Sequence, residues 1–184
     1  MTLVTDTLKI LVAVFLLVVL QVSAMPQLMP TEATPDLVAV LVVMLAIRRG
    51  MEAAALAGFM GGVLLDALSY QHLGLTSLLY VLVGVLIAAR LQPAEAIGPL
   101  PSLPPVLSHA RQFAWVIAGT AAVQVGMAIM LGLVGEGAGI RYELTQVIIP
   151  TVLETALIAL ALVPLLRWVF PVRIRIDVAA AAPA

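Results

Sequence analysis

The chain has 184 residues, of which 63% are hydrophobic and only 10% are charged. Soluble domains average about 45–50% apolar and about 25% charged residues, so this composition excludes an ordinary soluble globular protein. Nine Lys and Arg against ten Asp and Glu give a net charge of −1, which excludes a basic face for nucleic acid, and the absence of cysteine excludes disulfides and cysteine-bound metals.

Prolines, glycines and charged residues divide the chain into six apolar segments, which we expect to be membrane helices. In chain order they cover residues 9–28, 37–47, 51–70, 73–89, 113–134 and 144–170. The sequence Val22-Ser23-Ala24 is similar to a signal-peptidase site, but the apolar run continues beyond it, which favours a retained first helix. We therefore predict an all-α integral membrane protein, with one six-helix transmembrane domain over residues 1–177 and a disordered, alanine-rich tail over 178–184.

The second apolar segment is unusually short. It follows the helix-start sequence Thr34-Pro35-Asp36 and holds only 11 uninterrupted apolar residues. A helix of that length spans roughly 17 Å, well short of the ~30 Å hydrocarbon core of a bilayer. The segment must therefore borrow flanking residues, thin the membrane or pack inside the bundle.

Positive charge sets the expected orientation, because cytoplasmic loops of membrane proteins are enriched in Lys and Arg. If the N-terminus is cytoplasmic, eight of the nine cations lie on the cytoplasmic side and only Arg141 lies outside. Six spans then place both termini in the cytoplasm. We expect four of these cations to contact anionic lipid, or else a cytoplasmic partner: Arg48, Arg49, Arg90 and Arg111.

Eight of the ten acidic residues lie in loops or at helix ends, and the other two, Asp66 and Glu154, fall in the interior of apolar segments. A charge at the bilayer centre costs about 2.5–3.5 kcal/mol, so each is a functional candidate, with a hydrogen-bonded carboxyl inside the bundle as the structural alternative. Pro150 frees the carbonyl of Gln146 and so predicts a kinked, polar pocket near Glu154. The buried polar candidates are Gln124, Thr151, Glu154 and Thr155.

We expect no catalytic residue, cofactor or metal. An acid pair of Asp66 with Glu154 would suit an aspartyl-type peptidase or a proton-coupled carrier, but one carboxyl on each of two helices supports either only weakly. His72 and His109 fall on opposite sides of the membrane and cannot share a metal. Ser108-His109 lacks the G-x-S-x-G context of a serine hydrolase.

A stripe of small residues recurs every four positions on the third segment, at Ala54, Gly58 and Gly62, and ends at Asp66. Such flat faces let helix backbones approach closely in membranes. The stripe therefore either holds the bundle together internally, which is the commoner use, or receives the single helix of a partner protein.

Four features follow one another between residues 35 and 90. They are the Pro-Asp start of a short helix (Pro35-Asp36), a basic turn (Arg48-Arg49-Gly50), a G-x-x-x-G-x-x-x-D helix (Gly58, Gly62, Asp66) and an L-G-x-x-x-L hairpin (Leu73-Gly74 to Leu78), which runs on to Tyr80. Together they resemble the bacterial rod shape-determining MreD family. Spans one, five and six carry no motif that can be placed on that family, so any role of Glu154 rests on its position alone.

The resemblance implies a non-enzymatic scaffold of the cell-wall elongation machinery in the bacterial cytoplasmic membrane. The implied partners are MreC, which has one membrane helix, and beyond it MreB, the polymerase RodA and its class B penicillin-binding transpeptidase. The resemblance also implies a fold similar to the substrate-binding components of energy-coupling-factor transporters, so a small-ligand-binding component, with a pocket near Tyr70, His72 and Glu154, is the alternative function. The candidates for contact with the MreC helix are Ala54, Gly58, Gly62, Asp66, Leu73 and Gly74.

Overall fold

The computed structural model describes residues 2–28, 33–69, 74–91, 107–135 and 143–171. Its elements are α1 (Thr2–Ser23), the short α2 (Met25–Leu28), α3 (Leu37–Arg48), α4 (Met51–Leu68), α5 (Leu75–Leu91), α6 (His109–Val134), the π-helical segment η1 (Glu143–Ile148) and α8 (Ile149–Val169). The described residues contain no strand. The predicted all-α class is therefore confirmed.

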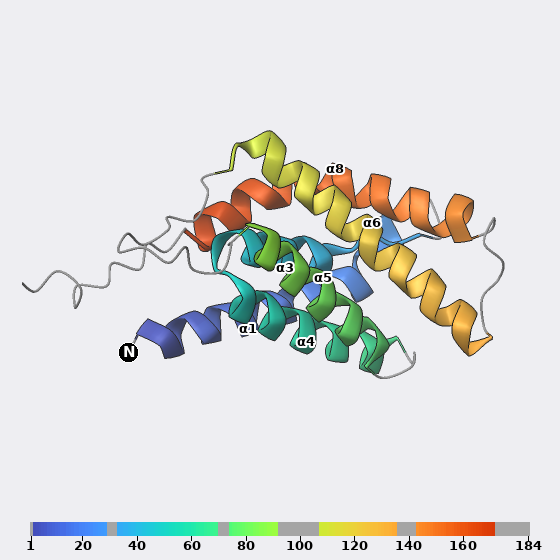
Figure 1. Ribbon diagram of the computed structural model, residues 1–184, viewed down its shortest axis with the longest axis horizontal. Coiled ribbons are helices and arrows are strands. Elements are labelled where there is room, and N and C mark those ends of the chain that lie inside the picture. The colour runs from blue at the N-terminus through green and yellow to red at the C-terminus, as the bar shows by residue number, and fades with distance from the viewer. Residues whose placement is uncertain (1, 29–32, 70–73, 92–106, 136–142, 172–184) are drawn as a thin grey trace, which may run out of the picture.

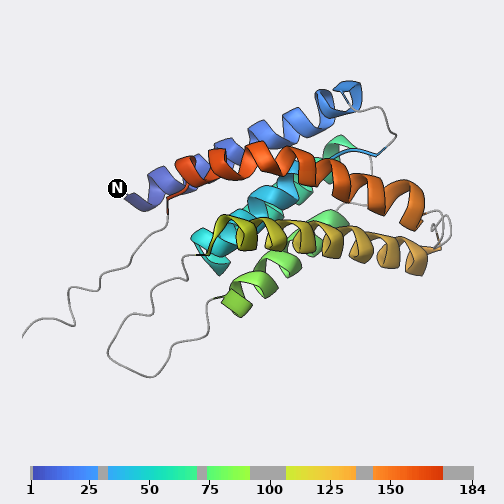
Figure 2. The ribbon, with the colours of Figure 1, turned by 90° about the horizontal axis from the view of Figure 1, so that it is seen from above.

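The long helices form a bundle in which neighbours along the chain run in opposite directions. Figure 1 shows α1, α4 and α6 running one way and α3, α5 and α8 running the other, and Figure 2 shows the same arrangement from above. Consequently α1 begins and α8 ends at the same end of the bundle, which we call the near end. The opposite end, where α3, α5 and α8 begin, is the far end.

Helix α3 lies at the centre of the bundle. Every residue from Leu37 to Ile47 is buried, and the helix contacts α1, α4, α5, α6 and α8. Glycines on three neighbouring helices allow this close packing, because a Cβ added at each would lie only 2.5–2.8 Å from a valine methyl of α3. The pairs are Gly61 with Val38, Gly84 with Val42, and Gly119 with Val43.

The short second segment thus packs inside the bundle, the third of the possibilities that its length leaves open. Four stretches within the described helices are long and apolar enough to cross a membrane: Thr5–Ser23, Met51–Leu68, His109–Leu133 and Gln146–Val169. Helices α3 and α5 are shorter. Each predicted apolar segment therefore contains a helix, and the six-span topology stays a prediction.

The boundaries of the first and last helices differ from the sequence prediction. Helix α1 begins at Thr2 rather than at residue 9, because the exposed Lys9 can sit on a helix without ending it. It ends at Ser23, before Pro26, and α2 follows. The predicted kink at Pro150 is instead a junction, where η1 passes into the first turn of α8. The predicted tail over 178–184 lies outside the described residues.

Candidate functional site

A buried carboxyl, Asp36, joins four helices at the far end of the bundle. Its backbone N–H donates to Thr155 Oγ1 at 2.8 Å, and its Oδ1 accepts from the Ala39 N–H at 2.9 Å, which caps the start of α3. The Tyr80 hydroxyl of α5 donates to Oδ1 at 2.6 Å, and Gln124 Nε2 of α6 donates to Oδ2 at 3.4 Å. We call Asp36, Tyr80, Gln124 and Thr155 the polar cluster.

The polar cluster provides hydrogen-bond donors to a carboxyl that is buried in an apolar bundle. Asp36 is only 3% exposed, and a buried carboxyl without donors would strongly destabilise the fold. Donors on α3, α5 and α6 satisfy it here, so these helices are held in one register. From the sequence, Asp36 was expected only to start a helix. The Pro-Asp and Tyr80 positions of the family resemblance were the one signal that could have found it.

A second buried carboxyl, Asp66, closes the hairpin between α4 and α5. It is 2% exposed, and its Oδ2 accepts a hydrogen bond of 2.7 Å from the Gly74 N–H. Gly74 has φ +96°, a left-handed conformation that suits glycine, and its carbonyl accepts from the N–H of Leu78 in the first turn of α5. Asp66 is therefore hydrogen-bonded inside the bundle, as its structural alternative expects, and a direct functional role of this carboxyl stays a prediction. Leu73 lies outside the described residues.

The small-residue stripe forms the contact between α4 and α5, the most extensive helix pair in the bundle. A Cβ added at Gly58 would lie 2.9 Å from the Tyr80 carbonyl carbon, and one at Gly62 would overlap the backbone of Ser77. Ala54 is fully buried against Gly84. A partner helix could not lie on Gly58 and Gly62 without displacing α5, so the structure corrects the expectation that this stripe is free for one.

Polar side chains from five helices border a cavity of about 400 Å³ at the far end. They include Gln21, Asp36, Asp66, Thr76, Gln124 and Thr151. The pocket expected near Tyr70, His72 and Glu154 can be compared with this cavity only at Glu154, because Tyr70 and His72 lie outside the described residues. Glu154 is buried on α8 but is not among the described residues that line the cavity.

Arg48 and Arg49 lie between helices at the near end. Arg48 Nε donates to the Phe170 carbonyl at 2.6 Å, which satisfies the C-terminus of α8. Arg49 Nη1 lies 3.5 Å from Asp6 Oδ2 of α1, and Arg49 Cζ lies 5.9 Å from the centroid of the Phe170 ring. Partial burial lowers the pKa of the Arg49 guanidinium, which stays charged at neutral pH. Both are thus engaged internally, whereas Arg90 and Arg111 are exposed.

Comparison with known families supplies the decisive observation. The family model described as rod shape-determining protein MreD matches residues 4–94, about half of the chain. The chain belongs to the MreD family. Comparisons with curated proteins and with solved structures found no match.

The family match covers those residues of the site that lie in the first half of the chain. Asp36, Asp66, Gly74 and Tyr80 lie within residues 4–94, together with the glycines of the α4–α5 contact. Proteins of the MreD family are structural components in shape determination. The chain is therefore a rod shape-determining membrane protein. Family membership and the apolar helices together identify an integral membrane protein.

Proposed function

We propose that this protein is a non-enzymatic scaffold of the cell-wall elongation machinery, which binds MreC and so helps to maintain rod shape. It would do so in the bacterial cytoplasmic membrane as a six-span protein with both termini inside. MreB, RodA and the class B penicillin-binding transpeptidase would be further partners. Membership of the MreD family carries this proposal.

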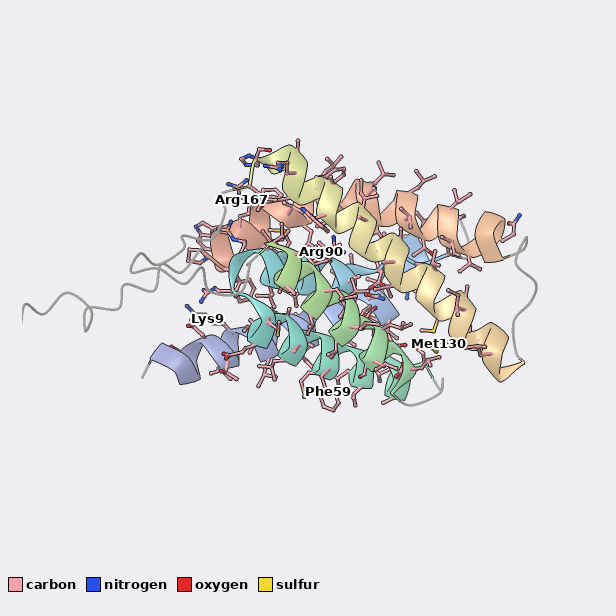
Figure 3. The ribbon with its side chains drawn as sticks, in the orientation of Figure 1. Lys9, Phe59, Arg90, Met130 and Arg167 are labelled. Atoms are coloured by element: carbon pink, nitrogen blue, oxygen red, sulfur yellow. The ribbon has the colours of Figure 1, made fainter. Side chains whose placement is uncertain are left out.

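The charge distribution supports the orientation. Lys9 and Arg167 lie toward the near end of the bundle in Figure 3, where α1 begins and α8 ends. The turn with Arg48 and Arg49 lies at the same end, because α3 runs toward it. A basic near end is expected to face the cytoplasm.

The outward surface supports binding of a single membrane helix. Large apolar side chains point outward on α1, α4, α5 and α8, and Figure 3 shows Phe59 of α4 pointing away from the bundle. Because the small-residue stripe is occupied by α5, the MreC helix would lie on one of these apolar faces instead. On α1 the face repeats at helical spacing through Leu8, Val12, Phe15, Leu16 and Val19.

The chain is well suited to a crosslinking test because it contains no cysteine. Single cysteines placed at outward positions, Leu16 on α1, Leu82 on α5 and Leu157 on α8, would be oxidised against one cysteine in the membrane helix of co-expressed MreC. We expect one outward position to form a disulfide with MreC. The fully buried Val14 supplies the inward control on α1 and should form none.

Affinity purification of the unmodified chain from membranes is the prior measurement. Retention of MreC in mild detergent supports the scaffold. Failure to retain it, together with no crosslink from any outward position, would refute the proposal, and co-purification of a pair of ATPases instead would favour the transporter alternative.

A further inference from the structure

The cavity at the far end has a mixed wall, in which polar side chains lie beside apolar ones, in a chain that is 63% hydrophobic. Its volume of about 400 Å³ is too large for a bare ion and falls in the range of small-molecule sites, about 300–1,000 Å³. Helices α1, α4, α5, α6 and α8 all contribute to its wall. A site assembled from five helices is preorganised by the whole bundle rather than by one loop.

Two threonines of the wall, Thr76 and Thr151, are buried and have no side-chain hydrogen-bond partner in the described part of the chain. Thr76 is 7% exposed and Thr151 is 3% exposed, and neither side chain makes a hydrogen bond there, in contrast to Thr120 and Thr155. Since both threonines line the cavity, their hydroxyls are available to whatever occupies it.

The charge of the wall selects the kind of occupant. Asp36 and Asp66 both line the cavity, while its described lining includes no Lys, Arg or His. Asp36 accepts hydrogen bonds from Ala39, Tyr80 and Gln124 through both of its carboxyl oxygens, whereas Asp66 uses only Oδ2, toward Gly74, among the described residues. The acceptors around the cavity therefore include one carboxylate oxygen of Asp66 and the hydroxyl oxygens of the two buried threonines.

We propose that this cavity binds a small organic cation that carries a primary ammonium group. An ammonium offers three N–H donors and no acceptor, which suits a wall that holds a carboxylate oxygen of Asp66 and the hydroxyl oxygens of Thr76 and Thr151. Pairing with a cation also compensates the burial of the Asp66 carboxylate in an apolar bundle. A metal ion fits less well, because the described residues contain no group of three metal-binding side chains. This inference does not depend on the scaffold function.

The test titrates the purified full chain in detergent with n-butylammonium and, in parallel, with n-butanol as an uncharged analogue of the same shape. Isothermal titration calorimetry should show saturable binding of n-butylammonium and none of n-butanol. Asp66→Asn keeps an acceptor for Gly74 but removes the charge, and Thr151→Val removes a hydroxyl that holds no protein partner in the described chain. Each should weaken binding about tenfold, the loss expected for one hydrogen bond to a charged group.

The controls make the outcome decisive. Gly132→Ala, at an exposed position of α6 that is not among the described lining residues and where a Cβ would meet no atom within 4 Å, should leave the affinity unchanged. Thr151→Val and Thr76→Val should fold normally, so they test the site even if Asp66→Asn does not fold. Equal binding of n-butanol, no saturable binding of n-butylammonium, displacement by an equal concentration of sodium chloride, or full affinity in both threonine variants would each overturn the proposal.

Discussion

Replacing Gly62 by alanine tests the central contact of the bundle. An added Cβ at this position would overlap the Ser77 backbone and would lie 2.7 Å from Ser77 Oγ, whereas non-bonded heavy atoms prefer about 3.5–4.0 Å. Helix α5 would have to move away by roughly 1 Å at this point. The movement would also strain the 2.9 Å hydrogen bond that Ser77 Oγ donates to the Phe59 carbonyl.

The expected loss follows from three effects of different sign. Overpacking costs about 1–3 kcal/mol, and a weakened hydrogen bond costs about 0.5–1.5 kcal/mol. Alanine returns about 1 kcal/mol because its helix propensity exceeds that of glycine. We therefore expect Gly62→Ala to lower the free energy of unfolding by about 2 kcal/mol and the melting midpoint by roughly 4–8 °C for a chain of this size.

Gly132→Ala is the matched control. It makes the same chemical change within helix α6, where a Cβ would meet no atom within 4 Å, so it should raise the midpoint slightly through helix propensity alone. The midpoints would be measured in detergent by tryptophan fluorescence and by far-ultraviolet circular dichroism. If Gly62→Ala raised the midpoint as much as Gly132→Ala does, the close packing of α4 on α5 would be refuted.

Two further variants probe the polar contacts at the two ends of the bundle. Tyr80→Phe removes a donor to the buried Asp36 and should destabilise the chain by about 1.5–3 kcal/mol in the same melting assay. The loss should be smaller when Asp36 is also replaced by Asn, and an equal loss with and without Asp36→Asn would contradict the pairing of Tyr80 with Asp36. Arg48→Lys cannot reproduce the Nε contact with the Phe170 carbonyl and should cost about 1 kcal/mol, whereas Arg90→Lys, at an exposed position, should be neutral. Equal midpoints for Arg48→Lys and Arg90→Lys would show that the Phe170 contact contributes nothing.

The local sequence of this chain predicts its helices better than it predicts its sites, because burial in the bundle decides what a residue on a helix contacts. The periodic glycines at 58 and 62 and the carboxyl at 66 were recognisable because they lie at four-residue spacing on a single helix. The structure shows why that spacing matters: the glycines admit α5, and Asp66 then reaches the Gly74 N–H at the start of the same helix. The stripe could be found from sequence, but whether it served the bundle or a partner could not.

The composition and the order of apolar segments by themselves determined that this is an all-helical membrane chain, because a hydrophobic run of sufficient length has few alternatives to a helix in a bilayer. The motif spacing between residues 35 and 90 was enough to indicate the family. Only the tertiary structure decided that Asp36 is the centre of a polar cluster, because its partners Tyr80, Gln124 and Thr155 lie 44, 88 and 119 residues away along the chain. The same holds for α3, whose apolar sequence is compatible with facing lipid and which is buried because glycines on three other helices leave room for it.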